Sequence, residues 1–277
     1  MNICEMTALE ISNAVKNKEI SVKDAVDAFF AAIDEYDGKY HCYNTLCKKE
    51  AYERAEEVQK GIDSGKYNGR LAGVPIGIKD NICTKDILTT CSSKILENFI
   101  PTYNATVVNR LNDEGMVIIG KLNMDEFAMG STTETSATGV THNPWDTDKV
   151  PGGSSGGAAA AVAARLSPVA LGSDTGGSIR QPCSFCGVSG LKPTYGAVSR
   201  YGLVAYASSL DQIGPMGKTV DDCAALFSVI QGKDEKDGTS MVYPKFDFDK
   251  AVKGDVGGKK IGIPEDYLGE GISPDVK

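Results

Sequence analysis

Residues 152–180 read GGSSGGAAAAVAARLSPVALGSDTGGSIR, and they indicate the fold class. The alanine-rich part, Gly156–Leu166, predicts a helix, and Val169–Gly172 predicts a short buried strand after it. A serine-bearing glycine motif lies on each side of this pair, at Gly152–Gly157 and at Asp174–Arg180. A helix and a strand joined by short turns are typical of an α/β fold.

Helical patterns dominate the segments further towards the N-terminus. Thr7 and Glu10 match a capping box, in which each side chain accepts a free backbone N–H, and a second helix starts in a similar way at Ser21–Asp24. We expect Gly38 to lie just beyond the end of that second helix. Further helices are predicted at Lys48–Lys66, Ala105–Glu114 and Thr219–Gln231.

Three more apolar runs predict strands. They lie within Leu71–Asp80, at Met116–Ile119 and at Ile261–Ile263, and Pro75 indicates either an edge strand or the start of its strand. The stretch Gly232–Gly258 is the most loop-like. Together with the helices, these runs predict an α/β fold with a mixed or mostly parallel sheet flanked by helices.

Composition narrows the class of protein. The chain has 277 residues and a formal net charge of −8, which argues against nucleic-acid binding by this chain alone. Its longest apolar run, around Ala158–Ala164, is too short to span a bilayer, and the N-terminus has no secretory pattern. These features predict a soluble cytoplasmic protein.

The chain divides into two predicted regions. Residues 1–66 form a helical region that packs on the core or on a partner, and residues 67–277 form the core. Ser273–Asp275 is a good helix start, with a serine N-cap and proline in the first turn. We therefore expect a polypeptide that continues beyond Lys277, with a frayed polar tail as the alternative.

The chain also contains eight cysteines. The close pairs are Cys42 with Cys47 and Cys183 with Cys186, and a zinc site would need two well-spaced pairs or a matching histidine pattern. Plain thiols are therefore the favoured interpretation.

Histidine is almost absent, since only His41 and His142 occur. A serine nucleophile in this chain would therefore need another base. Lys79 follows the apolar run Val74–Ile78, where burial would lower its pKa and make the neutral amine available. The alternative is a structural lysine paired with Asp80 or another acid.

The two glycine motifs suit carbonyl chemistry. Gly152–Gly157 directly precedes a helix, which argues against a flexible linker, and it lacks the Gly-Lys-Ser/Thr of a phosphate-binding P-loop. In the second motif, successive N–H groups at Thr175–Ser178 can converge on a developing oxyanion. Ser178 would then be placed to attack a carbonyl carbon.

Lys79, Gly152–Gly157 and Gly176–Arg180, in this order and spacing, resemble the amidase signature family. The resemblance implies a mixed α/β fold and a Ser–cis-Ser–Lys triad. It assigns the nucleophile to Ser178, the bridging serine after a cis peptide to Ser154, the base to Lys79, and the oxyanion hole to Thr175, Gly176 and Gly177.

Along essentially its whole length, the chain resembles one branch of that family, the glutaminase subunits of tRNA-dependent amidotransferases. The segments that carry this likeness are Lys121–Ser131, Asn143–Asp146, Gly190–Gly196, Val198–Leu203 and Ser208–Pro215. The likeness implies that glutamine is the substrate and that Met129, Gly130 and Ser131 line its pocket. It also implies partner subunits B and C. The B subunit would use ATP and Mg²⁺ and hold misacylated Glu-tRNA(Gln), and this chain would carry no metal.

Members of this branch are longer than 277 residues. The resemblance places the residues that bind the α-amino and α-carboxyl groups of glutamine in the part that is missing here, so we expect little glutaminase activity from this chain alone. A stand-alone amidase of small amides and a non-catalytic fragment are the alternatives.

Overall fold

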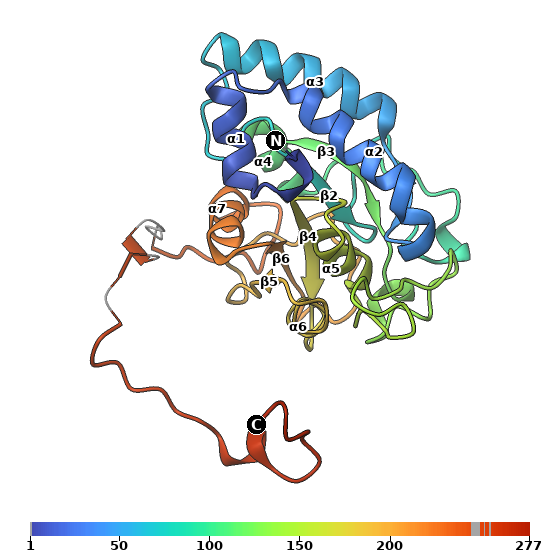
Figure 1. The fold of residues 1–277 in the computed structure, drawn as a ribbon, viewed down its shortest axis with the longest axis vertical. Helices are drawn as coiled ribbons and strands as arrows, with labels where there is room; N and C mark the ends of the chain where they lie inside the picture. The colour runs from blue at the N-terminus through green and yellow to red at the C-terminus, as the bar shows by residue number, and fades with distance from the viewer. Residues whose placement is uncertain (1, 245–249, 252, 255) are drawn as a thin grey trace. The chain divides into compact units, whose positions relative to one another are not determined.

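The computed structural model describes residues 2–244, 250–251, 253–254 and 256–277 (Figure 1). The chain divides into two compact units, residues 1–246 and residues 247–277. The first unit contains the sheet and the residues of the candidate site.

The sheet of the first unit is mixed. In the described residues its order is β1-β3-β2-β4-β6-β5; β2 runs parallel to β3 and β4, and the outer pairs are antiparallel. The strands are β1 (Tyr43–Leu46), β2 (Pro75–Lys79), β3 (Val117–Leu122), β4 (Val169–Asp174), β5 (Ser189–Gly190) and β6 (Gln212–Gly217). The predicted α/β class with a mixed sheet flanked by helices is confirmed.

Helices surround this sheet. They are α1 (Ala8–Lys16), α2 (Val22–Tyr40), α3 (Lys48–Asp63), α4 (Thr106–Glu114), α5 (Gly156–Ala163), α6 (Arg180–Cys186) and α7 (Val220–Ile230), with 3-10 turns η1 (Ile3–Glu5), η2 (Lys94–Leu96), η3 (Glu126–Ala128) and η4 (Glu265–Leu268). Helix α3 packs against β3, α5 against β4 and β2, and α7 against β6. Figure 1 shows α1, α2 and α3 close together.

Both predicted capping boxes are present. The Thr7 and Ser21 hydroxyls each accept the backbone N–H three residues on, and the side chains of Glu10 and Asp24 return the bond. The position predicted for Gly38 is wrong, because α2 continues past it to Tyr40.

His41 ends helix α2 instead of a glycine. It has left-handed backbone with φ 54°, and its N–H donates to the Asp37 carbonyl. The Asp37 carboxylate also accepts the backbone N–H of Cys42 at 2.7 Å, which fixes where the chain leaves the helix.

One core joins the N-terminal helices to the sheet. Ile11 of α1 and Phe29 of α2 lie in the same buried cluster as Ile76, Ile119 and Leu171 of the strands. Intramolecular packing therefore buries the apolar faces of these helices. The boundary at residue 66 stays a prediction.

Strand β2 lies inside the sheet, and Pro75 is its first residue, where a missing N–H is tolerated. Gly77 lets β2 and β3 approach closely, since a Cβ there would lie 2.6 Å from the Leu122 side chain. The sequence did not predict β1, β5, β6 or α6. In β6, Pro215 and two glycines give a pattern that is typical of a loop.

The second unit departs from one prediction. Ile261–Ile263 is not a strand, and the side chains of Ile261 and Ile263 are 89% and 71% exposed. The Ser273 hydroxyl accepts the Asp275 N–H at 3.2 Å, but residues 274–276 form a turn and not a helix. The part of the predicted loop up to residue 244 is irregular, whereas residues 245–249, 252 and 255 lie outside the described residues.

Candidate functional site

The candidate site lies at the carboxyl ends of two neighbouring parallel strands. Strands β2 and β4 pair in parallel, with Gly77 opposite Ala170 and Ile78 opposite Leu171. Lys79 is the last residue of β2, and β4 ends in Ser173 and Asp174. Because the ends of parallel neighbours meet at one edge, these three polar residues come together inside the protein.

Lys79 is fully buried and is surrounded by oxygen atoms. Its Nζ lies 2.7 Å from Ser154 Oγ, 2.9 Å from Ser173 Oγ and 3.3 Å from the Ser173 carbonyl oxygen. Burial lowers the pKa of Lys79 to about 7, and the carboxylates of Asp125 and Asp174 oppose that change. Near neutral pH, a substantial fraction of Lys79 is therefore a neutral amine that can accept a proton.

Asp80 has other partners than Lys79. Its carboxylate accepts hydrogen bonds from Asn44 at 2.9 Å and from the Thr90 backbone N–H at 3.1 Å. The cation that pairs with it is Lys121, at 3.8 Å, and both side chains are fully buried. The alternative interpretation, in which Lys79 forms a structural ion pair with Asp80, is therefore wrong.

The first glycine motif is a buried turn rather than a linker. Residues 152–157 are all buried and lead into α5, which is apolar on every side and itself enclosed. The peptide bond between Gly153 and Ser154 is cis. A Cβ on Gly153 would lie 2.0 Å from Asp125 Oδ2, so only glycine fits the close approach at this point.

The second glycine motif is folded around the Asp174 carboxylate. This carboxylate accepts the backbone N–H groups of Gly177 at 2.7 Å and Ile179 at 3.1 Å, and it pairs with the Arg180 guanidinium at 3.0 Å. Burial raises the pKa of Asp174, but the bonds from Arg180, Ile179 and Gly177 outweigh burial and hold that pKa below its ordinary value. Asp174 therefore stays ionised and fixes the turn.

The N–H groups predicted for an oxyanion hole fall into two kinds, those already bonded within the protein and those without an acceptor. The Gly177 N–H is already donated to Asp174. The backbone N–H groups of Gly176 and Ser178 have no acceptor within the described residues. The Thr175 hydroxyl bonds to the Asp211 carboxylate, which anchors the start of the turn.

The backbone brings Ser178 next to the Lys79–Ser154 pair. The carbonyl oxygen of Ser178 accepts the N–H of Ser155 at 3.2 Å, and Ser155 is the residue after Ser154. Ser178 itself is partly exposed, whereas Ser154 and Lys79 are completely buried. The three predicted catalytic residues therefore lie together, with Ser178 nearest to solvent.

The segment predicted to line the substrate pocket borders the first glycine motif. Met129, Gly130 and Ser131 are exposed. The carboxamide of Gln181 bridges them to the first motif, because it donates to the Ser131 carbonyl at 3.0 Å and accepts the Gly153 N–H at 2.9 Å.

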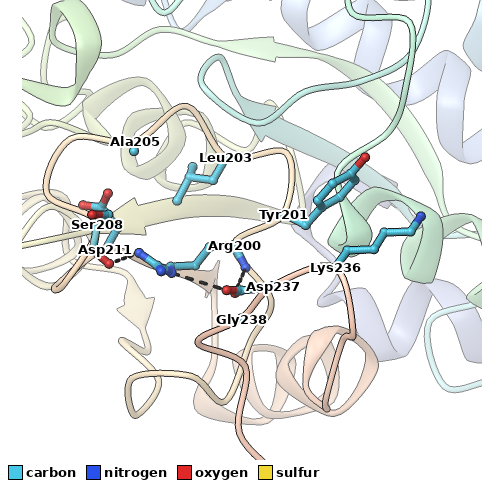
Figure 2. A pocket seen from close by; sticks show the side chains of 9 residues that line it. All are labelled: Arg200, Tyr201, Leu203, Ala205, Ser208, Asp211, Lys236, Asp237 and Gly238. Carbon is cyan, nitrogen blue, oxygen red and sulfur yellow. Dashed lines mark hydrogen bonds and ion pairs between the residues drawn. The ribbon is translucent and has the colours of Figure 1, made fainter.

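A cavity of about 230 Å³ borders this site, because Asp211 lines it and also bonds to Thr175. Figure 2 shows the side chains that line this cavity. Arg200 lies along it, where its backbone N–H donates to the Asp237 carboxylate at 2.8 Å. The lining residues are Arg200, Tyr201, Leu203, Ala205, Ser208, Asp211, Lys236, Asp237 and Gly238. Asp211 therefore contacts both the cavity and the second glycine motif.

The histidines and cysteines have local roles. His41 ends α2, and the His142 ring bonds to the Thr147 carbonyl. All eight cysteines are free thiols, and seven are buried. Within the described residues, no group of three or more His, Cys, Asp or Glu side chains is arranged to hold a metal ion. None of the helices there has the length and apolar character needed to cross a membrane.

Sequence reasoning missed Ser173, Asn81 and Asp125 as parts of the site. Asn81 donates to Ser173 Oγ at 3.0 Å, and one carboxylate oxygen of buried Asp125 has no partner within the described residues. The available signals were that Ser173 adjoins Asp174, that Asn81 lies two residues after Lys79, and that Asp125 falls within the segment Lys121–Ser131.

Comparison with known proteins gives consistent matches. Residues 24–277 match the family described as Amidase. The chain is 58% identical over 278 residues to the A subunit of the glutamyl-tRNA(Gln) amidotransferase of Lachnoclostridium phytofermentans, covering 100% of this chain and 56% of that protein. For the corresponding protein of Agathobacter rectalis, which has the same name, the identity is 59% and the coverage 100% and 55%. This chain thus spans little more than half the length of these relatives.

Solved structures agree in fold. The crystal structure of the A subunit of the glutamyl-tRNA(Gln) amidotransferase from Thermotoga maritima is 45% identical with a TM-score of 0.75, over 88% of this chain and 50% of that chain. The peptide amidase of Stenotrophomonas maltophilia is 34% identical with a TM-score of 0.83, over 88% and 51%.

Proposed function

The chain belongs to the amidase signature family, and from this membership we propose that it is part of a glutaminase that releases ammonia for tRNA-dependent amidation. The observation that carries the proposal is the buried contact of 2.7 Å between Lys79 Nζ and Ser154 Oγ, beside Ser178. A neutral amine next to a hydroxyl is a base in position to accept its proton.

The proposed reaction is a two-step acyl transfer. Ser178 Oγ attacks the side-chain amide carbon of glutamine while its proton passes to Ser154 Oγ, and the Ser154 proton passes to Lys79. The N–H groups of Gly176 and Ser178, with that of Thr175, stabilise the oxyanion. The proton returns by the same route to the leaving nitrogen, which departs as ammonia. Water then hydrolyses the glutamyl ester on Ser178.

The wider assembly is part of the same proposal. The relatives' names refer to amidation of glutamyl-tRNA(Gln), which supports Glu-tRNA(Gln) as the final acceptor. We propose that B and C subunits complete a cytoplasmic heterotrimer and that the B subunit supplies the ATP and Mg²⁺ chemistry. Met129, Gly130 and Ser131 border the site and would form one wall of the glutamine pocket.

A second candidate has its own support. The similarity to a peptide amidase, with a TM-score of 0.83, favours hydrolysis of small amides without a partner. The same serines and lysine would serve this reaction. Rapid hydrolysis of simple aryl amides by the chain, unchanged by added B and C subunits, would favour this candidate over the glutaminase.

The test is covalent labelling with a fluorophosphonate, which reacts with an activated serine and needs no glutamine pocket. We expect the label on Ser178, located by peptide mass spectrometry, and a loss of about 10²-fold or more in rate for Ser154→Ala and Lys79→Met. Ser12→Ala is the matched control, because Ser12 is equally buried and bonds to the Ala72 carbonyl, away from the two motifs. Labelling that is absent, or that Ser154→Ala leaves unchanged, would refute the triad.

Ammonia release separates the chain from the complex. We expect the 277-residue chain alone to release little ammonia from glutamine and to gain activity when the B and C subunits and a full-length relative's remaining half are supplied. Substantial release by the chain alone would contradict the expectation that part of the glutamine site lies elsewhere.

A further inference from the structure

Lys79 has hydrogen-bond partners that the proposed triad does not use. Besides Ser154 Oγ, the amine contacts two oxygens of one residue, the hydroxyl of Ser173 at 2.9 Å and its carbonyl at 3.3 Å. Ser173 is 4% exposed, and Asn81, 2% exposed, donates to its hydroxyl at 3.0 Å. None of these contacts belongs to the proposed route of the proton from Ser178.

The number of oxygens matches the number of N–H bonds on a lysine ammonium. An ammonium has three N–H donors and accepts nothing. When Lys79 has taken the proton, one N–H can face Ser154 Oγ and the other two can face the two Ser173 oxygens. Hydrogen bonds to an ionised group are the stronger kind, so these oxygens favour the protonated lysine.

The same contacts orient the neutral amine. A neutral amine has two N–H bonds and one lone pair. If Ser173 receives both N–H bonds, the lone pair is left pointing at Ser154 Oγ, which is the atom that must give up a proton. Asn81 occupies a further position on the Ser173 hydroxyl, and Ser155 Oγ bonds to the Ser173 carbonyl at 3.1 Å. Both acceptors are thus held in place.

We propose that Ser173, held by Asn81, is a positioning residue for the Lys79 base: it directs the lone pair of the neutral amine to Ser154 and supplies two acceptors to the ammonium that forms. This inference rests on the proposed function for its catalytic meaning, but its effect on Lys79 can be measured without catalysis.

Other charged or titratable groups also act on Lys79. They are Asp125, which follows β3, Asp174 at the end of β4, Cys91 in the loop after β2, and Asp211 before β6. The variants below leave all four in place. A change in the titration of Lys79 is therefore due to the Ser173 contacts.

The primary test is an NMR titration of the whole chain carrying [ε-¹³C]lysine, with the Lys79 signal assigned by its loss in Lys79→Met. Ser173→Ala removes one acceptor for the ammonium, so the pKa of Lys79 should fall by about one unit. Asn81→Ala leaves the hydroxyl but frees it to rotate, so its shift should be in the same direction and smaller. Ser12→Ala, which removes a buried hydroxyl bonded to the Ala72 carbonyl, should leave the pKa unchanged.

The second readout is the pH dependence of fluorophosphonate labelling. In Ser173→Ala the rise of the labelling rate with pH should move to lower pH by the same amount, while the maximum rate falls. A purely structural role would lower the rate without moving the rise. An unchanged or raised Lys79 pKa in both Ser173→Ala and Asn81→Ala would overturn the inference, even where Ser178 is labelled normally.

The two proposals fail separately. If Ser178 is never labelled but the pKa of Lys79 falls in Ser173→Ala, the proposed function is refuted and the control of Lys79 by Ser173 stands. If Ser178 is labelled and the Lys79 signal titrates identically in all variants, the control of Lys79 by Ser173 is refuted and the proposed function stands.

Discussion

Asp80 and Lys121 form an ion pair at 3.8 Å with both side chains fully excluded from solvent, and the residue before Asp80 is a lysine with no such pair among the described residues. Burial lowers the pKa of both Lys121 and Lys79. Lys121, however, compensates a buried carboxylate, whereas Lys79 faces hydroxyl and carbonyl oxygens. The two lysines should therefore differ sharply in what they contribute to stability.

Removing these two lysines should destabilise the fold to very different extents. Lys121→Met leaves Asp80 as an uncompensated buried charge and should destabilise the fold by about 3 kcal/mol. Lys79→Met removes an amine that burial disfavours and should cost far less. Urea unfolding at pH 7.5 measures both, each variant serving as the control for the other. Equal losses would show that Lys121 does not compensate Asp80.

Serine labelling should depend on pH through Lys79. The pKa of about 7 means that the amine is protonated, and unable to accept a proton, below that pH. The rate of fluorophosphonate labelling at Ser178 should therefore be low at pH 5.5, rise through pH 7 and level off above pH 8. A rate that is constant or falls over this range would contradict a lysine base.

The depressed pKa also predicts how stability varies with pH. Between about pH 7 and the ordinary value of 10.5, the unfolded chain binds a proton at Lys79 that the folded chain does not. Stability therefore rises with pH in this window, by about 1.4 kcal/mol per unit for this one group. As the pH is raised from 7 to 9.5, the free energy of unfolding of the wild type should therefore increase relative to that of Lys79→Met. Urea unfolding at several pH values measures this, and the same pH dependence in both proteins would rule it out.

Two glycines should respond oppositely to alanine. In Gly153→Ala the new Cβ would lie 2.0 Å from Asp125 Oδ2 and 2.7 Å from the Thr132 backbone nitrogen, so we expect a loss of roughly 2–3 kcal/mol. Gly38 lies inside α2, and a Cβ there meets nothing within 4 Å. Gly38→Ala should stabilise by about 0.5–1 kcal/mol. Thermal unfolding of both variants checks the pair; destabilisation by Gly38→Ala would be the contradicting result.

Asp174 should matter more than the arginine paired with it. Asp174→Ala removes the acceptor for the Gly177 and Ile179 N–H groups and should slow labelling of Ser178 by about 10²-fold. Arg180→Ala leaves those two bonds in place, and the Arg180 side chain is already 54% exposed. Its effect should be several-fold at most. The reverse order of labelling rates would mean that the guanidinium, not the carboxylate, holds the turn.

The local elements of the fold were largely predictable, because their signals lie within a few residues of one another. The capping boxes at Thr7 and Ser21 and the buried strand ending in Lys79 are of this kind. The end of α2 was not predictable, because the Asp37 carboxylate and not Gly38 decides it. The Ile261–Ile263 pattern has the apolar alternation of a strand but no neighbouring strand in the described residues.

The candidate site was predictable in its motif residues and not in their surroundings. The motifs predict Lys79, Ser154 and Ser178 as site residues. In the structure Lys79 contacts Ser154, and the Ser178 carbonyl accepts the N–H of Ser155. Ser173 joins them because β4 pairs with β2 across about 90 residues of chain, which no local pattern reveals. The position of the unpartnered Asp125 oxygen was not predictable either, because that oxygen lies beside Gly153, which is 28 residues further along the chain.

The parallel pairing of β2 with β4 also limits how the chain can change. Successive side chains of a strand point to opposite faces, so one inserted or deleted residue between Pro75 and Ile78 would turn the Lys79 position to the other face. The amine would then leave Ser154 and Ser173 and enter the apolar packing of its neighbours. Length variation between Pro75 and Ile78 is therefore incompatible with the site.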